Sequence, residues 1–314
     1  DKYGKDRTAV CCLSSLNLEN YDEWKDEPGF IEDIMRFLDN VLTDFINRAP
    51  ESFDDAKYSA MRERSVGLGV MGFHSFMQKN MIPIESVMAK VWNKKMFQLI
   101  DKEVNAASKK LAEERGPCPD AAEYGINERF SNKTAIAPTA SISIICGGAS
   151  PGIEPIAANS YTHKTLSGSF NVRNKYLRKI LQKYNQDTNE IWSSITTNQG
   201  SVDHLDFLSQ DEKDVFKTAF EIDQRWLIDH SADRTPYISQ AQSLNVFIPA
   251  DIHKKQLHQI HYQAWKKGLK SLYYCRSKSI QRAEVVNDSF AKTKKQKEQE
   301  KQQTTDYEEC LSCQ

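Results

Sequence analysis

The sequence predicts an α/β fold in which strands pair in parallel, and two observations support this prediction. Apolar residues recur at helical spacing in several long segments, and short strand-like runs lie between those segments. Strands that alternate with helices favour crossover connections, which leave neighbouring strands parallel. With 314 residues, of which 39% are hydrophobic and 27% charged, the chain is large enough to bury a sizeable core.

Four segments are predicted to be amphipathic helices. Residues 31–46 and 97–111 each carry an apolar stripe at helical spacing. The second of these helices is expected to stop at Gly116, which can take a left-handed conformation and is followed by Pro117. Segments 211–230 and 254–267 show the same pattern. The strongest strand-like runs between the helices are 134–137, 243–248 and 269–275.

Charge, hydropathy and cysteine usage exclude several classes of protein. A net charge of -1 gives no whole-chain electrostatic case for binding nucleic acid. No apolar run approaches the roughly 18 residues that a membrane helix needs, and the polar residues 1–7 do not resemble a signal peptide. The chain contains 7 cysteines, an odd number that argues against a secreted disulfide framework. We therefore predict a cytoplasmic protein, in the host cytoplasm if the protein is viral.

The composition changes near residue 287. From there to Glu309 the chain is nearly free of aliphatic residues and is rich in Lys, Gln and Glu. Such a segment cannot bury enough apolar surface to offset the entropy lost on ordering. We therefore predict a globular part over residues 1–286 and a flexible tail over residues 287–314.

The predicted tail ends in a Cys-x-x-Cys pair, Cys310 and Cys313. A dithiol on a flexible tether can visit both an interior disulfide and an external reductant, so the position favours thiol–disulfide exchange. Two other interpretations stay open. Zinc would need two further ligands, for which only His258 and His261 offer a suitable spacing, and the two thiols could also have no role. We expect no metal site in this chain.

Three internal motifs have both a functional and a structural interpretation. Tyr273 and Tyr274 are adjacent, and taken alone they are most simply two aromatics on opposite faces of a core strand. The run Thr139, Ala140 and Ser141 follows a strand-like segment, where backbone N–H groups and small hydroxyls can bind an anion, although an ordinary turn would look the same. Residues 67–72 match GxGxxG, but no buried strand precedes them, so tight packing explains these glycines better than a dinucleotide does.

These and other segments resemble, in order, the large subunit of class I (Ia-type) ribonucleoside-diphosphate reductases. The resemblance covers nearly the whole chain, and its specificity lies in the collinear order of motifs that are individually weak. The matching segments are AVCCLSSL (9–16), RSVGLGVMG (64–72), PTAS (138–141), SPGIEPIAANSYTHKTLSGS (150–169), YISQAQSLN (237–245), LKSLYYCRS (269–277) and CLSC (310–313). Ile142 departs from the pattern, because some relatives have a hydroxyl residue there.

The resemblance implies a fold and a role for each motif. The family has a ten-stranded α/β barrel made of two five-stranded parallel halves, and this chain would form the second half with its helices. Thr139, Ala140 and Ser141 would bind the diphosphate of the substrate. Cys11 would be one of the two cysteines oxidised in each turnover, and Cys310 and Cys313 would reduce the resulting disulfide. Tyr273 and Tyr274 would relay a radical between the subunits.

The family's Asn-x-Cys-x-Glu segment, which carries the radical cysteine, does not occur in these 314 residues. The resemblance therefore implies a C-terminal part of the large (alpha, catalytic) subunit, expected from a split gene, that works with an N-terminal large-subunit fragment. Nucleotide effectors would bind that missing N-terminal part. This chain would bind no cofactor itself, since the radical would come from a small (beta) subunit with a dimetal-tyrosyl centre.

The predicted activity is the reduction of ribonucleoside diphosphates to deoxyribonucleoside diphosphates for DNA replication, with thioredoxin or glutaredoxin as the external reductant. One alternative is a non-enzymatic remnant or regulatory piece that binds the small subunit. Another is a free-standing thiol oxidoreductase, but that would need a thioredoxin-like βαβ unit around the Cys-x-x-Cys pair, and the charged tail supplies none. No nucleic acid or membrane partner is expected.

Overall fold

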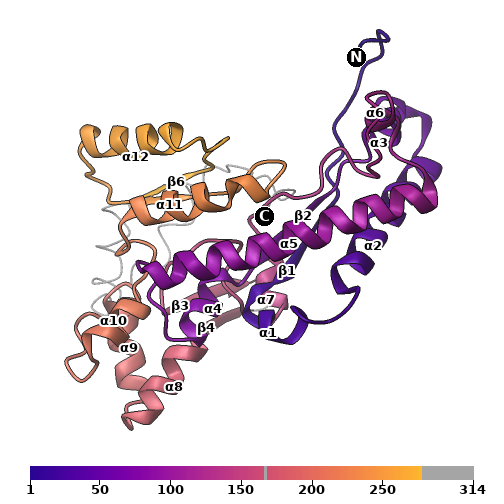
Figure 1. Ribbon diagram of the computed structural model, residues 1–314. Coiled ribbons are helices and arrows are strands. Elements are labelled where there is room, and N and C mark those ends of the chain that lie inside the picture. Colours follow the sequence, from indigo (N-terminus) through magenta and orange to yellow (C-terminus); the bar gives the residue numbers. More distant parts are fainter. Residues whose placement is uncertain (166–167, 278–314) are drawn as a thin grey trace, which may run out of the picture.

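The computed structural model describes residues 1–165 and 168–277 (Figure 1). Three predictions concern residues outside this described part: the boundary between residues 286 and 287, the flexible tail over 287–314 and the terminal dithiol. In the first half of the chain, the elements are β1 (Leu13–Asn17), η1 (Leu18–Asn20), α1 (Tyr21–Trp24), α2 (Phe30–Arg48), η2 (Glu51–Phe53), α3 (Asp54–Glu63), β2 (Gly67–Met71), α4 (Phe73–Lys79), α5 (Val87–Arg115), α6 (Pro119–Ala122) and α7 (Ile142–Ile145). In the second half they are β3 (Ser160–Thr165), β4 (Gly168–Arg173), α8 (Lys175–Lys183), α9 (Asn189–Thr197), α10 (Gln210–Val215), α11 (Gln224–Arg234), η3 (Thr235–Tyr237), β5 (Val246–Ile248), α12 (Lys254–Lys266) and β6 (Cys275–Ser277).

Five chain segments pair in parallel, in the order in which they occur in the sequence. β1 pairs with β2, and a parallel bridge joins Leu68 of β2 to Thr134. A second bridge joins Ile136 to Gln242, and the chain that follows continues as β5, which pairs with β6. This arrangement and the helices between the strands confirm the predicted α/β fold with parallel pairing, as expected for half of a barrel.

All three predicted strands differ from the observed ones in extent. The run 243–248 forms a regular strand only over Val246–Ile248. The run 134–137 makes isolated bridges in place of a continuous strand. Regular pairing of the last segment begins only at Cys275, although the strand was predicted from residue 269. Before that point the N–H of Tyr274 donates to the Asn245 side chain rather than to a backbone carbonyl, which interrupts the ladder.

The glycines of β2 allow the neighbouring chain to approach closely. β2 is buried along its whole length. A Cβ atom added at Gly69 would lie 2.2 Å from the carbonyl oxygen of Ala135, and one added at Gly67 would lie 2.9 Å from the Ala135 Cβ. Gly67 and Gly69 lie inside a strand rather than in a turn after one, so packing accounts for the GxGxxG match.

Three of the four predicted helices form as expected. α2 contains the stripe at 31–46, and α12 matches the prediction for 254–267. The stripe at 97–111 lies within α5, which ends at Gly116 with a φ of 82°. In Figure 1 this long helix crosses the molecule, and it packs against both α2 and α11.

The prediction of one helix over residues 211–230 is wrong. The segment is divided into α10 and α11, and Asp223 caps the start of the second helix by accepting from the N–H of Arg225. Between the helices, the N–H of Ala219 donates to the Ile156 carbonyl, and the Glu221 carboxylate accepts from the N–H of Thr218. These tertiary and turn contacts replace the helical hydrogen bonds. The antiparallel hairpin of β3 and β4 was also not predicted.

The buried apolar side chains of the described residues form one large cluster and two smaller ones. The large cluster fills the space between β1, β2, α2, α4 and α5. A second cluster lies among α8, α9 and α10 around Trp192 and Phe216, and a third joins β5 to α11 and α12. No helix in the described part of the chain is long and apolar enough to cross a membrane.

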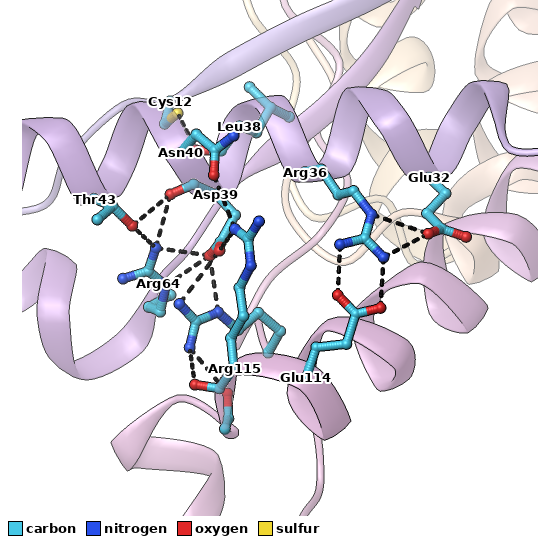
Figure 2. A network of polar contacts seen from close by, with 12 residues as sticks. Cys12, Glu32, Arg36, Leu38, Asp39, Asn40, Thr43, Arg64, Glu114 and Arg115 are labelled. Carbon is cyan, nitrogen blue, oxygen red and sulfur yellow. Dashed lines mark hydrogen bonds and ion pairs between the residues drawn. The ribbon is translucent and has the colours of Figure 1, made fainter.

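A buried carboxylate, Asp39 of α2, holds one end of the molecule together (Figure 2). It accepts hydrogen bonds from Arg64 at 2.8 Å, from Arg115 at 2.7 Å and from Arg129 at 2.9 Å. Burial alone would raise the pKa of Asp39, but the three guanidinium groups outweigh burial and hold the pKa below its usual value. These contacts fasten the ends of α3 and α5 to the middle of α2.

Candidate functional site

The rings of Tyr273 and Tyr274 are in contact just before β6. Their centroids are 4.1 Å apart and the planes are inclined by 50°. Both side chains reach the surface, with exposed fractions of 38% and 51%. The interpretation as two core aromatics on opposite faces of a strand is therefore wrong. Regular strand geometry begins only at Cys275, so the alternation of side chains does not apply to this pair.

The backbone of the pair is fixed from the neighbouring segment. The N–H of Tyr273 donates to the Leu244 carbonyl at 2.9 Å, and the N–H of Tyr274 donates to Asn245 Oδ1 at 2.9 Å. The guanidinium of Arg276 lies 4.9 Å from the centroid of the Tyr274 ring, within the range of a cation–π contact. The two exposed rings thus stand on an ordered backbone.

Asn245 is itself held by a buried carboxylate, Glu154. The backbone N–H of Asn245 donates to Glu154 Oε1 at 2.9 Å, and Asn245 Nδ2 donates to Oε2 at 3.1 Å. Burial raises the pKa of Glu154, while the Asn245 hydrogen bonds and the charge of Arg276 act in the opposite direction. Sequence reasoning placed both residues in family-like segments but assigned neither a role. The only signal was an acidic residue in the stretch that follows the predicted phosphate loop.

The predicted phosphate loop has a strained backbone at Thr139. This β-branched residue is buried and has a φ of 56°, which such residues rarely adopt, and strain of this kind is concentrated at functional sites. Its Oγ1 accepts from the N–H of Gly152 at 2.7 Å. Ala140 and Ser141 are exposed, and neither backbone N–H donates to another residue in the part of the chain that the structure describes. Two exposed donors are therefore available to an anion.

Parallel pairing brings the segment that carries this loop next to the segments that hold the tyrosine pair. Ile136 pairs with Gln242, so Thr139 and Asn245 each lie three residues further along their segments. Val246 pairs with Cys275, so Asn245 and Tyr274 each lie one residue earlier. The segments that carry Thr139, Asn245 and Tyr274 are therefore consecutive in the order of parallel pairing.

Cys11 lies apart from these groups. It precedes β1, the first of the five parallel segments, and its side chain is exposed. The adjacent Cys12 is buried, with its Sγ 3.8 Å from the Leu38 carbonyl, and burial raises the pKa of this thiol. Of the two, Cys11 is the one accessible to a partner thiol. Cys310 and Cys313 lie outside the described residues.

Neither the zinc interpretation nor the cavities locate another site. Within residues 1–165 and 168–277, no cluster of three His, Cys, Asp or Glu side chains could hold a metal ion. His258 packs against Tyr262 on α12, and His261 Nδ1 lies 2.9 Å from the Leu257 carbonyl. A surface cavity lined by Trp24, Phe30 and Leu99 contains none of the predicted site residues.

Comparison with known proteins identifies the relatives of this chain. A family model described as "Ribonucleotide reductase, barrel domain" matches residues 2–124 and 120–275. The ribonucleoside-diphosphate reductase large subunit of Invertebrate iridescent virus 6 is 51% identical over 287 residues, which cover 90% of this chain and 30% of that protein. The large subunit of Invertebrate iridescent virus 3 is 45% identical over 284 residues, which cover 90% and 45%. The chain thus spans less than half the length of these relatives.

A solved structure has the same fold. The alpha subunit of the Actinobacillus ureae class Id ribonucleotide reductase superposes with a TM-score of 0.81 at 39% sequence identity. The match covers 90% of this chain and 52% of that one.

Proposed function

This chain belongs to the ribonucleotide reductase barrel-domain family, and from that premise we propose that it forms part of the catalytic subunit of a ribonucleoside-diphosphate reductase. The observation that carries the proposal is the contact between Tyr273 and Tyr274, with ring centroids 4.1 Å apart. Adjacent phenols at this distance suit a radical relay, because oxidation of one ring can be coupled to reduction of its neighbour. A small radical-generating subunit would deliver the radical to this exposed pair.

The loop at Thr139, Ala140 and Ser141 would bind the diphosphate of the substrate. The free N–H groups of Ala140 and Ser141 favour this role, since backbone donors of this kind bind phosphate oxygens. The bond from Gly152 to Thr139 holds the loop in its strained conformation, ready for the anion.

The chemistry would be reductive removal of the 2′ hydroxyl. A ribonucleoside diphosphate and two thiols give a deoxyribonucleoside diphosphate, water and one disulfide, so the thiols supply both electrons and the hydroxyl leaves with a proton as water. Cys11 would be one of these thiols. The other thiol, the radical cysteine and the nucleotide effector sites would come from an N-terminal large-subunit polypeptide. Cys310 and Cys313 would reduce the disulfide by thiol exchange and be reduced in turn by thioredoxin or glutaredoxin.

Reconstitution tests the proposal. The chain is combined with a polypeptide that carries the Asn-x-Cys-x-Glu segment, the small subunit and a dithiol, and deoxyribonucleotide formation is measured. Product is expected only from the complete mixture. Assembly with the small subunit but no product would favour the alternative of a non-enzymatic binding piece.

The first prediction concerns the tyrosine pair. Tyr273→Phe or Tyr274→Phe is expected to abolish turnover while subunit assembly is unchanged, because phenylalanine has no phenol group that could be oxidised and pass on the radical. Tyr262→Phe is the matched control, since Tyr262 is exposed on α12 to a similar degree, 49% against 51% for Tyr274. Turnover by either relay variant at the parent rate would remove the relay role.

The second prediction concerns the terminal dithiol. Cys310→Ser is expected to permit a single turnover but to stop repeated turnovers when thioredoxin is the reductant. Cys146→Ser, which alters an exposed cysteine elsewhere, is expected to leave both unchanged. Full multiple turnover by Cys310→Ser with thioredoxin would show that the tail does not act as a reductant.

A further inference from the structure

A chain of hydrogen bonds runs from a buried carboxylate to the tyrosine pair. Both oxygens of Glu154 accept from Asn245, and Asn245 Oδ1 accepts from the N–H of Tyr274. We propose that Glu154 is a positioning residue for the radical relay, acting through Asn245 to fix the backbone of Tyr274 and hence its ring contact with Tyr273. The inference rests on the relay role in the proposed function and adds a residue outside the relay itself.

The polarity of the chain explains why a carboxylate suits this position. An ionised carboxylate only accepts hydrogen bonds, whereas an asparagine side chain has a donating and an accepting end. Glu154 therefore forces the Nδ2 end of Asn245 to face it. The Oδ1 end is then turned toward Tyr274, where it accepts the backbone N–H. A neutral amide at position 154 would not impose this orientation.

The segment that leads into Glu154 is held in place by several hydrogen bonds. Two residues earlier, the N–H of Gly152 donates to Thr139 Oγ1. Ser150 exchanges hydrogen bonds with Ser75, and its carbonyl accepts from the N–H of Gly72 at 2.7 Å. The segment 150–154 is thus fastened to the phosphate loop, to α4 and to the end of β2. A rigid segment of this kind can set the position of Tyr274 relative to the loop.

Glu154 makes no ion pair with any residue that the structure describes, although only 8% of this residue is exposed. Burying a carboxylate without a cation is unfavourable. The nearby positive group is Arg276, whose charge acts on Glu154 and whose guanidinium packs on the Tyr274 ring. The backbone and the ring of Tyr274 thus each contact a residue that interacts with Glu154.

Glu154→Gln in the reconstituted enzyme tests the inference. The new Nε2 donor would draw Asn245 Oδ1 toward itself and turn Asn245 Nδ2 toward the N–H of Tyr274. Two N–H donors would then face each other, and the hydrogen bond to the Tyr274 backbone would be lost. We expect kcat to fall by about tenfold, which corresponds to the loss of one hydrogen bond. The KM for ribonucleoside diphosphate is expected to stay within about twofold of the parent value. Hydrogen exchange at the Tyr274 amide is expected to accelerate by a factor similar to the fall in kcat.

A charge swap supplies the decisive comparison. Combining Glu154→Gln with Asn245→Asp gives the new amide nitrogen at position 154 an acceptor and leaves a carboxylate oxygen for the N–H of Tyr274. The double variant is expected to recover most of the lost kcat and the slow exchange. Asn245→Asp alone faces Glu154 with a second carboxylate and is expected to be impaired. Glu212→Gln is the matched control, because Glu212 is also a buried carboxylate, 7% exposed, and accepts from a backbone N–H, that of Ser209.

Two readouts separate this inference from the proposed function. Amide exchange at Tyr274 does not depend on turnover, so unchanged exchange in Glu154→Gln would overturn the inference whatever the activity. A loss of kcat that the charge swap fails to restore would also overturn it. If the parent assembly makes no deoxyribonucleotide while the exchange responds as expected, the proposed function fails and the hydrogen-bond chain is retained.

Discussion

Asp39 and Glu154 are both buried carboxylates, but their surroundings differ in kind. Three guanidinium groups surround Asp39 and lower its pKa (Figure 2). In the described part of the chain, Glu154 accepts hydrogen bonds only from Asn245, and burial raises its pKa. The first arrangement neutralises the charge and ties three elements together. The second leaves the carboxylate without an ion pair among the described residues, and its accepting oxygens orient one amide. The difference shows that a buried charge can stabilise a fold or position a neighbour, according to its partners.

The largest effect on stability is expected at the ion-paired site. Asp39→Ala leaves three arginines without their shared carboxylate, and we expect the free energy of unfolding to fall by about 3 kcal/mol. That is the lower end of the range for breaking a buried ion pair, because Arg115 is partly exposed and can turn to water. Denaturant unfolding of the chain measures this effect. A loss of stability no larger than that of the surface variant Arg36→Gln would mean that the ion pairs of Asp39 do not stabilise the fold, and the contrast with Glu154 would fail.

A smaller effect on stability is expected at the positioning site. Glu154→Gln removes one good hydrogen bond and also the unfavourable burial of a charge, so the two changes oppose each other. We expect the free energy of unfolding to change by less than about 1 kcal/mol. The same denaturant measurement applies. If the loss equalled that of Asp39→Ala, Glu154 would be mainly a stabilising residue.

The two carboxylates are also expected to give pH dependences of opposite sign. Asp39 has a lowered pKa, so its contribution to stability is present above the unfolded value of about 3.9 and is lost as the pH falls through the folded pKa. Glu154 has a raised pKa, so the folded state binds the proton more tightly than the unfolded state. Its contribution is present below about 4.3 and is lost as the pH rises through the folded pKa.

Unfolding measured between about pH 3 and pH 7 distinguishes these cases. The stability of the parent relative to Asp39→Asn is expected to grow as the pH rises in the acidic range. Relative to Glu154→Gln, the stability of the parent is expected to decline with rising pH. Slopes of the same sign for both pairs would contradict the contrast between the two sites.

The smallest effect is expected at the surface of α2. Arg36 pairs with Glu32 and with Glu114 (Figure 2), and the Glu114 side chain is 39% exposed. Because water screens exposed ion pairs, Arg36→Gln is expected to leave the unfolding midpoint nearly unchanged. A marked loss of stability would mean that the exposed ion pairs of Arg36 stabilise the fold as strongly as the buried ion pairs of Asp39.

Local patterns predicted the helices that depend on local interactions. The stripe at 31–46 and the stop at Gly116 were both confirmed, since periodicity and a positive φ are properties of a few neighbouring residues. The continuous helix over 211–230 failed because Ala219 bonds to Ile156, far away in the sequence. A pattern within the segment carries no information about that contact.

The candidate site shows the same division. The adjacent tyrosines, the Thr139 loop and Cys11 were found from motifs and their order. The ring contact of the tyrosines was not, since strand alternation predicts opposite faces. Glu154 was missed as a functional residue because nothing in its own segment indicates that it accepts hydrogen bonds from Asn245, 91 residues away.

The sequence by itself determined the family, the parallel α/β fold and the candidate site residues, because composition, periodicity and motif order are properties of the chain. Only the tertiary structure decided how those residues are held. It placed the segments that carry Thr139, Asn245 and Tyr274 next to one another, and it gave Asp39 three ion pairs, whereas Glu154 makes none among the described residues. The physical reason is that the hydrogen bonds and charges around a buried group come from segments distant in sequence, which meet only when the strands pair.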